Sequence, residues 1–377
     1  MALVLNEEQQ LLKESAEGFF AEKAPVSQLR QLRDDKSEQG FAPELWQEMA
    51  EMGFTGLLAD EDMGGTGFGY VGAGIVAEAM GTTLAASPFL SSSVIALSAL
   101  SGFEGDAAET LAASVAAGET VATLALDETS KHAPEKTAMK AVKSDSGYVL
   151  NGMKTFVPDG HVADKIIVLA RTSEEAGNPM GLSVFVVDRG TSGLIVDRTS
   201  MADSRNWAKI TFENVSVSAD NLLGTEGEGW KTLELAIDKA RLVIAAELLG
   251  ISQEAYRTTM EYLKERKQFD TIIGSFQALQ HRAAHLYSEI EVTRSAVLKG
   301  LQVADEGQNV AWFASLAKAK ASKTAELATN EAIQMHGGIG MTDEYDIGLY
   351  IKRARVLQHL YGDFNFHSDR FASLSGY

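Results

Sequence analysis

The first part of the chain repeats apolar and polar positions with the period of an α-helix. Asn6, followed by the acidic residues Glu7 and Glu8, has the properties of a helix N-cap. One apolar stripe at helical spacing follows this cap: Leu11, Leu12, Ala16, Phe19 and Phe20. Residues 42–52, 71–80 and 87–100 continue the helical pattern, and the glycine-rich residues 63–69 predict a loop. We therefore expect residues 1–118 to form a helical N-terminal domain.

The middle of the chain has a different texture. Short runs rich in β-branched residues are separated by turn residues, at 120–126, 147–152, 165–170, 182–187 and 208–212. Such runs are typical of a small antiparallel barrel or sandwich. We predict that residues 119–225 form an antiparallel β-barrel domain.

The helical period returns in the last part of the chain. Long periodic runs cover residues 230–265, 277–306, 309–334 and 348–373, with short links between them. Long helices with short links favour an up-and-down four-helix bundle, which we expect over residues 226–377. The order of helices, strands and helices indicates an α+β fold with a β domain between two helical ones.

Composition limits the classes of function. The 377 residues carry a formal net charge of −19, which argues against binding of nucleic acid because that requires a basic surface. The chain has no Cys, which excludes disulfides, Cys-ligated zinc and thiol catalysis. The seven His show no metal-binding spacing such as HExxH, so no metal site is expected.

Targeting signals are not evident either. No run of about 18 apolar residues is present, so we expect no transmembrane helix. Residues 1–8 lack a basic stretch followed by an apolar core, so no secretory signal is expected. Together with the absence of Cys, this favours a cytoplasmic location.

The strongest chemical signal begins at the end of the first long C-terminal helix. Residues 265–270 read Glu-Arg-Lys-Gln-Phe-Asp. Arg266 can donate two hydrogen bonds to a diphosphate, and Phe269 offers a flat face to a ring. Gln277 follows after a short loop, and its side-chain amide can both donate and accept hydrogen bonds.

A glycine-rich turn follows 57 residues after Gln277, within Gln334-Met335-His336-Gly337-Gly338-Ile339-Gly340. Gln334 again offers a donor and an acceptor. Gly337 and Gly338 allow a backbone to approach a bulky ligand closely. Taken with the preceding motif, this turn predicts a site for a large, phosphorylated, aromatic cofactor that is built from helices.

These two motifs resemble the flavin-sharing segment of the acyl-CoA dehydrogenase family, and the resemblance extends over essentially the whole chain. Residues 63–67 look like the family's N-terminal Gly-Gly loop, residues 152–156 like its Asn-Gly-x-Lys strand, and residues 227–230 like the turn before its central helix. The resemblance implies FAD between the β domain and the bundle, and an acyl-CoA cleft. It also implies an oxidoreductase that introduces an α,β double bond into an acyl-CoA thioester.

This chemistry requires a carboxylate base in a desolvated cleft. The family carries Glu before Gly near its C-terminus, but Tyr361 stands at that position. Its second known location, just before the Arg of the central helix, is Ala240 in front of Arg241. The sequence therefore departs from the family at both positions, and Tyr is a poor base for this step because its pKa is near 10.

Two other carboxylates are candidate catalytic residues. Glu247 is the only charge within residues 242–251 and lies two helical turns after Ala240. The alternative for Glu247 is a structural ion pair with an Arg or Lys of the bundle. Asp363 lies two residues after the usual position, and its alternative is a helix cap or a contact with the cofactor ribose.

The resemblance also marks positions for the flavin ring and for the substrate. Phe156 and Pro158 stand where the family has its Trp-x-Thr facing the flavin, and Pro158 has no N–H to donate. Asp238 and Arg241 match positions near the acyl-CoA cleft, and their three-residue spacing lets them share a helix face. A surface ion pair is the alternative for these two residues.

We expect an FAD-dependent acyl-CoA dehydrogenase that works as a homotetramer or homodimer, with an acceptor like electron-transfer flavoprotein. One alternative is a cofactor-sharing subunit of a heterotetramer with a sister chain, because residues 360–363 and 369–370 resemble paired dehydrogenases for steroid-type CoA esters. A desulfinase or flavin oxidase of the same fold is the other alternative.

Overall fold

The computed structural model describes residues 3–377. Met1 and Ala2 lie outside the described residues. They are part of residues 1–8, for which no secretory signal is expected. Contacts divide the chain into two compact units. The helical unit contains the N-terminal segment up to Gln31, Tyr70–Ala86 and Arg241–Tyr377, and the mixed unit contains Leu32–Gly69 and Ser87–Ala240. The division into segments 1–118, 119–225 and 226–377 stays a prediction about the organisation of the chain.

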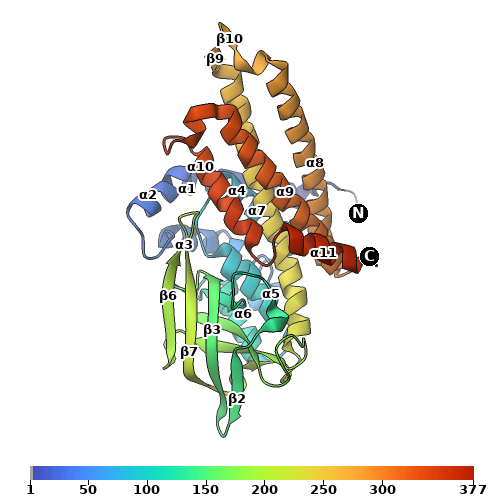
Figure 1. The fold of residues 1–377 in the computed structure, drawn as a ribbon. Helices are drawn as coiled ribbons and strands as arrows, with labels where there is room; N and C mark the ends of the chain where they lie inside the picture. The colour runs from blue at the N-terminus through green and yellow to red at the C-terminus, as the bar shows by residue number, and fades with distance from the viewer. Residues whose placement is uncertain (1–2) are drawn as a thin grey trace. The chain divides into compact units, whose positions relative to one another are not determined.

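The helices have the following bounds (Figure 1): α1 Glu7–Lys23, α2 Val26–Asp34, α3 Pro43–Glu51, α4 Gly69–Thr83, α5 Leu97–Leu100, α6 Asp106–Ala116, α7 Gly229–Glu265, α8 Gln277–Glu306, α9 Val310–His336, α10 Ile347–His359 and α11 Phe364–Leu374. The expected cap of α1 is confirmed, because Asn6 accepts a hydrogen bond from the amide of Gln9 at 2.8 Å while the Gln9 side chain accepts one from the amide of Asn6 at 3.0 Å. Helical N-terminal and C-terminal parts are thus present as expected.

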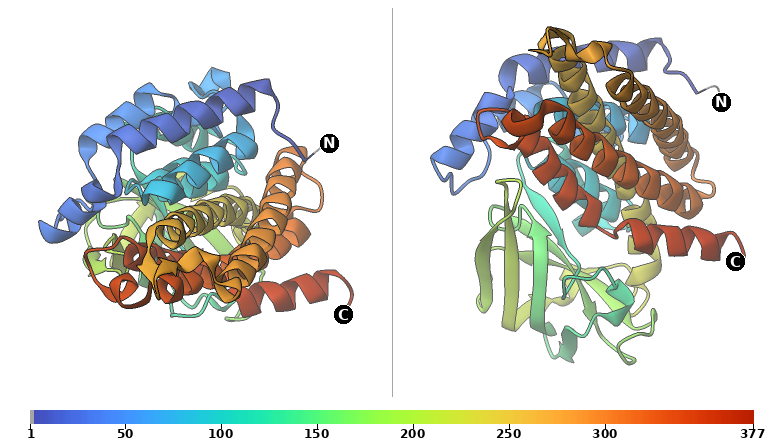
Figure 2. Two further views of the ribbon diagram at one scale, coloured as in Figure 1. Left: turned by 90° about the horizontal axis from the view of Figure 1, so that it is seen from above. Right: turned by 45° about the horizontal axis from the view of Figure 1, so that its top comes forward.

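Within the helical unit, α9 contacts α8, α10 and α11, which appear as the orange and red segments of Figure 2. The expected helix over residues 348–373 was wrong, since it is broken into α10 and α11. Tyr361 has a φ of +55° and Gly362 a φ of +109°, both outside the helical region. A Cβ at Gly362 would lie 2.4 Å from Cδ1 of Phe366, so only glycine fits this turn.

The expected helix over residues 87–100 also differs in detail. Residues Phe89–Ala96 form a π-helix, and only Leu97–Leu100 are α-helical. All of these residues are buried in the mixed unit. The helical pattern therefore could not distinguish the wider π turn from an α-helix.

The mixed unit contains a sheet of eight strands: β1 Ala122–Ala125, β2 Lys140–Ser144, β3 Gly147–Pro158, β4 Lys165–Arg171, β5 Leu182–Asp188, β6 Leu194–Ser200, β7 Asn206–Ser218 and β8 Leu222–Leu223. Their order is β6-β7-β3-β2-β4-β5-β8, and β1 pairs with β4. Strands β2, β6 and β8 were not predicted because they are short or carry mostly exposed, polar residues.

The expected antiparallel barrel is not confirmed. β1 runs parallel to β4, with Ala122 opposite Lys165, and β2 meets β4 in parallel at Lys140 and Arg171, so the sheet is mixed. Among the described strands, no pairing joins β6 to β8 and closes the sheet. Alternation of apolar residues reports which face of a strand is buried, and it carries no information on the direction of the neighbouring strand.

The middle of α7 is buried on all sides. Residues 242–248 are fully buried, although Glu247 is among them. Two glycines allow α4 and α7 to approach closely: a Cβ at Gly250 would lie 2.0 Å from the carbonyl oxygen of Glu78, and a Cβ at Gly81 would lie 2.4 Å from that of Glu247. The close contact of these two helices therefore depends on the absence of two side chains.

No helix among residues 3–377 has the length and apolarity that crossing a membrane requires. The same residues contain no cluster of three or more His, Asp or Glu side chains that could hold a metal ion.

We predict that Gly250→Ala lowers the free energy of unfolding by about 1–3 kcal/mol, because the added methyl group meets a backbone carbonyl that cannot rotate away. Gly18→Ala in α1 is the control, since its Cβ would meet nothing within 4 Å and helix propensity favours Ala by about 0.5–1 kcal/mol. Denaturant unfolding of both variants measures the difference. Equal stability of the two variants would contradict the close helix contact.

Candidate functional site

The basic motif after α7 forms a small hairpin. β9 Lys267–Gln268 pairs with β10 Thr271–Ile272. Phe269 and Asp270 form the two-residue turn, with φ values of +54° and +60° that are typical of a type I′ turn. This turn holds the Phe269 side chain 87% exposed, although a buried Phe would be more stable by about 1.5–3 kcal/mol. Its ring lies edge-on to that of Phe276, which is 38% exposed, with the centroids 6.2 Å apart.

Arg266 stands at the base of this hairpin and is exposed. Within residues 3–377 its guanidinium makes no ion pair shorter than 4 Å, whereas Arg257 on the same helix pairs with Glu254 and Glu261. Arg266 therefore keeps its hydrogen-bond donors available for an anion such as a diphosphate.

The glycine turn lies at the same end of the helical unit. α9 ends at His336, whose ring stacks on Tyr262 of α7 with centroids 4.4 Å apart. Gly337 has a φ of +64°, and a Cβ at Gly337 or Gly338 would meet no atom within 4 Å. Tyr262 is one helical turn before Arg266, so the open glycine turn and the basic hairpin belong to one surface.

Gln277 and Gln334 complete this set. Gln277 is the first residue of α8, and Gln334 lies in the last turn of α9. Both side chains are exposed. The six residues predicted for the diphosphate end are therefore all exposed, and their chemistry fits a phosphorylated ligand.

The residues predicted for the flavin ring lie in the mixed unit, on β3. The pairing of β3 with β7 shifts register between Lys154 and Val157. Phe156 sits in this irregularity with a φ of +52° and is 41% exposed. Pro158 is buried opposite Trp207, and its carbonyl accepts a hydrogen bond from the Thr123 hydroxyl at 2.6 Å.

Buried Lys154 supports this strand and was not predicted as a site residue. Its Nζ donates to Oε1 of Glu128 and to the carbonyl of Leu126, both at 2.9 Å. Burial would raise the pKa of Glu128, but the charge of Lys154 and hydrogen bonds from the amides of Ala138 and Met139 hold that pKa below its usual value. Burial also lowers the pKa of Lys154 itself. The pair fastens the loop between Leu126 and Met139 to β3, because Glu128 also accepts hydrogen bonds from the amides of Ala138 and Met139.

The two candidate bases lie in the helical unit, and both have partners. Glu247 accepts hydrogen bonds from Arg353 on α10, at 2.7 Å from Nε and 3.1 Å from an Nη atom, and the two side chains are 0% and 4% exposed. This geometry favours the structural alternative for Glu247. The fully buried carboxylate is held by a buried cation and is a poor acceptor for a substrate proton.

Asp363 is the N-cap of α11, and its Oδ1 accepts a hydrogen bond from the amide of Phe366 at 2.8 Å. The expected helix cap is therefore present. Asp363 is only half-buried, and within residues 3–377 its other oxygen has no hydrogen bond. The side chain can cap the helix with one oxygen and accept a hydrogen bond or a proton from a ligand with the other.

Asp238 and Arg241 are 1% and 2% exposed, so a surface ion pair does not describe them. The Nε of Arg241 donates to the carbonyl of Tyr361 at 2.9 Å, and its guanidinium lies 5.2 Å from the ring centroid of Phe366. The structure thus places Arg241 against residues 360–363, which we call the 360–363 turn.

Lys318 of α9 was not predicted, although it contacts the same turn. Its Nζ donates to the carbonyls of Gln358 at 3.0 Å and Gly362 at 3.1 Å. Burial, with a smaller effect from the charge of Arg241, lowers its pKa to about 7. The sequence does carry a signal that Lys318 is buried. Lys318 lies four residues after Ala314, so it shares the helix face of α9 on which small residues are buried.

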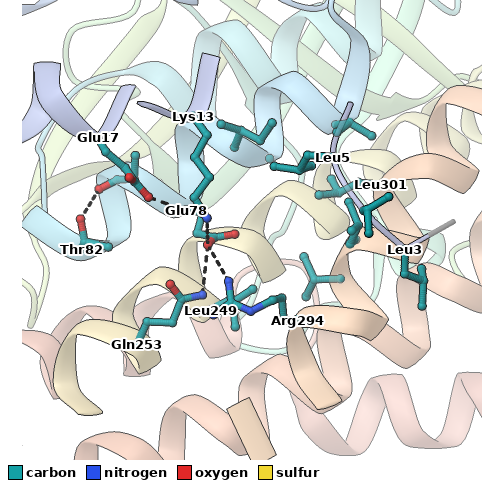
Figure 3. A pocket seen from close by; sticks show the side chains of 17 residues that line it. Leu3, Leu5, Lys13, Glu17, Glu78, Thr82, Leu249, Gln253, Arg294 and Leu301 are labelled. Atoms are coloured by element: carbon teal, nitrogen blue, oxygen red, sulfur yellow. Dashed lines mark hydrogen bonds and ion pairs between the residues drawn. The ribbon is translucent and has the colours of Figure 1, made fainter. Parts of the chain in front are cut away.

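A separate cavity of about 180 Å³ lies within the helical unit and contains none of the predicted site residues (Figure 3). Glu78 forms its polar end and accepts hydrogen bonds from Lys13 at 3.4 Å, Gln253 at 3.0 Å and Arg294 at 3.4 Å. Apolar side chains form the remaining wall, including Ile75, Leu249 and Leu301. The charges at its polar end are matched within the chain.

Known proteins resemble the chain over its whole length. Three family models match: the acyl-CoA dehydrogenase N-terminal domain over residues 6–110, the middle domain over 127–215 and the C-terminal domain over 227–373. The probable acyl-CoA dehydrogenase YngJ of Bacillus subtilis is 30% identical over 367 residues, which cover 95% of this chain and 95% of that protein.

Solved structures show the same similarity. Butyryl-CoA dehydrogenase from Megasphaera elsdenii has 25% identity and a TM-score of 0.91, with both chains covered completely. A chain of the ChsE4-ChsE5 complex from Mycobacterium tuberculosis has 26% identity and a TM-score of 0.90, again with both chains covered completely. The chain therefore belongs to the acyl-CoA dehydrogenase family of oxidoreductases.

We predict that Glu247→Gln lowers the free energy of unfolding by about 3–5 kcal/mol, because it removes the carboxylate that pairs with the buried charge of Arg353. Glu261→Gln on the same helix is the control, since the pair of Glu261 with Arg257 is 57% exposed on both sides and should contribute less than about 1 kcal/mol. Denaturant unfolding tests this difference, and a loss below about 1 kcal/mol for Glu247→Gln would contradict the structural role.

Proposed function

We propose that this chain binds FAD and oxidises the Cα–Cβ bond of an acyl-CoA thioester. The observation that carries the proposal is the match of all three family domains along one chain. The surface of Arg266 and the glycine turn adds support, because it offers an exposed cation that has no ion pair among the described residues, beside backbone that a ligand can approach. FAD, when bound, supplies the acceptor for the hydride that leaves Cβ.

In this proposal the diphosphate and adenine end of FAD contacts the surface formed by Arg266, Phe269, Gln277, Gln334, Gly337 and Gly338. The exposed ring of Phe269 supports the contribution of this surface to a neighbouring copy, as in a homodimer or homotetramer. Phe156, which is 41% exposed, contacts the flavin ring in this proposal. Pro158 is buried and its carbonyl is occupied by the Thr123 hydroxyl, so it stays a predicted cofactor residue that supports Phe156 on the same strand.

Asp363 is the base in this proposal. Glu247 is held by Arg353, whereas Asp363 keeps one carboxylate oxygen without a hydrogen bond among the described residues and is half-buried. A bound acyl chain would exclude water from this oxygen and leave it as the acceptor for the substrate proton. Asp238 stays a predicted substrate contact, and an acceptor like electron-transfer flavoprotein stays a predicted partner.

The test of the reaction uses the purified chain. We expect a yellow protein whose flavin absorbance is lost when an acyl-CoA thioester is added without oxygen. Asp363→Asn should keep the helix cap, because Asn and Asp cap helices about equally well. It should lower kcat by roughly 10²- to 10⁴-fold because it removes the base.

Asp369→Asn is the matched control, since Asp369 is an exposed residue of the same helix α11. Unchanged kcat in Asp363→Asn would remove Asp363 from the mechanism. A colourless chain that takes up flavin only after mixing with a sister subunit would instead support the cofactor-sharing alternative.

The cofactor surface is tested separately. We predict that Arg266→Ala weakens FAD binding by roughly 10- to 100-fold, which is the loss expected for hydrogen bonds to a charged group. Arg257→Ala is the control, because Arg257 is an exposed residue of the same helix whose donors are used by Glu254 and Glu261. Flavin fluorescence titration of the apoprotein measures both variants. Equal affinities would contradict the assignment of Arg266 to the diphosphate.

A further inference from the structure

The 360–363 turn has an unusual backbone for its sequence. Tyr361 has a φ of +55°, a left-handed conformation that costs a residue with a side chain about 1–2 kcal/mol. Gly362 follows at +109°, and Asp363 returns to extended backbone as the cap of α11. The surroundings must therefore hold this turn in place.

Lys318 supplies one fixed contact. Its side chain is 0% exposed, and within residues 3–377 it makes no ion pair with a carboxylate. Its two acceptors are the carbonyl of Gln358, in the last turn of α10, and that of Gly362, in the 360–363 turn. The carbonyl ends of α10 carry partial negative charge, so the buried ammonium is stabilised by the helix terminus.

Arg241 supplies the second fixed contact from a different helix. Its Nε donates to the carbonyl of Tyr361, and its side chain is 2% exposed. The three carbonyls of Gln358, Tyr361 and Gly362 are thus occupied by two buried cationic side chains, one from α7 and one from α9. A shift of the turn would leave a buried donor without its acceptor, and this is costly in a desolvated position.

We infer that Lys318 is a positioning residue, which fixes the 360–363 turn together with Arg241 so that the carboxylate of Asp363 stays in the geometry for proton removal. This inference rests on the proposed function, because it takes Asp363 as the base. Lys318 acts through the backbone and touches no reacting atom. Burial and the charge of Arg241 lower the pKa of Lys318, whereas the charge of Asp363 raises it. The net lowering agrees with a side chain that is screened from water.

The consequence for catalysis follows from distance. A base misplaced by about 1 Å can reduce the rate by roughly 10²-fold. Loss of the Lys318 contacts would let the turn relax, and the oxygen of Asp363 would move with it. The binding of the CoA portion does not depend on this turn in the proposal, so kcat should respond more strongly than KM.

The experiment compares Lys318→Met with Lys320→Met in the full-length flavin-loaded protein. Met fills similar space without a donor, whereas Lys320 on the same helix forms a surface ion pair with Glu289. We expect Lys318→Met to lower kcat by roughly 10- to 100-fold while KM changes less than about threefold. Hydrogen exchange of the amides at 359–366 should become faster, and Lys320→Met should change neither quantity.

Lys318→Gln provides a second variant if Lys318→Met does not accumulate as folded protein. It keeps one amide donor on a shorter side chain, so we expect a smaller loss of kcat in the same direction. Unchanged amide exchange at 359–366 would overturn the positioning role, and so would faster exchange with unchanged kcat. If the wild-type protein oxidises no acyl-CoA, the proposed function fails, and amide exchange then decides alone whether Lys318 holds the turn.

Discussion

The burial of charged side chains among the helices is the constraint on which the helical unit depends. Glu247 lies in a stretch of α7 that is buried on all sides, and its ion pair with the guanidinium of Arg353 stabilises the carboxylate there. Gly81 and Gly250 bring α4 against the same part of α7. α7, α4 and α10 therefore have a fixed register with respect to one another, because a shift would separate the ion pair or bring backbones into collision.

The same arrangement explains why the charge in the apolar run of α7 is structural. A carboxylate that takes a proton from a substrate needs a free oxygen and a route for the substrate to reach it. Glu247 has neither, whereas Asp363 lies at the start of a helix and keeps one oxygen outside the cap. Tyr361 contributes its backbone carbonyl to the contact with Arg241. Lys318 and Arg241 thus hold the 360–363 turn through hydrogen bonds to its backbone carbonyls.

The two ends of the proposed flavin site differ in how they are made. Arg266, Phe269 and the glycine turn are exposed, and their conformations come from local features: a two-residue hairpin turn and a helix end. On β3, Phe156 lies at an irregularity of the strand, and Lys154 fastens the neighbouring loop through Glu128. Local sequence therefore suffices for the conformation of each piece of the first end, although the stacking of His336 on Tyr262 joins two distant segments there. The second end depends on such distant contacts for its conformation as well.

Periodicity and residues close together in the chain were enough to predict the long helices, the cap at Asn6 and the family. The pairing of Glu247 with Arg353, the contact of Lys318 with the 360–363 turn and the parallel direction of β1 and β4 became visible in the folded chain alone. Each of these pairings joins residues or strands far apart in the chain, and an apolar pattern records that a position is buried without recording its neighbour. The break between α10 and α11 belongs to the same group, since the left-handed turn at Tyr361 persists where two other helices supply donors to its carbonyls.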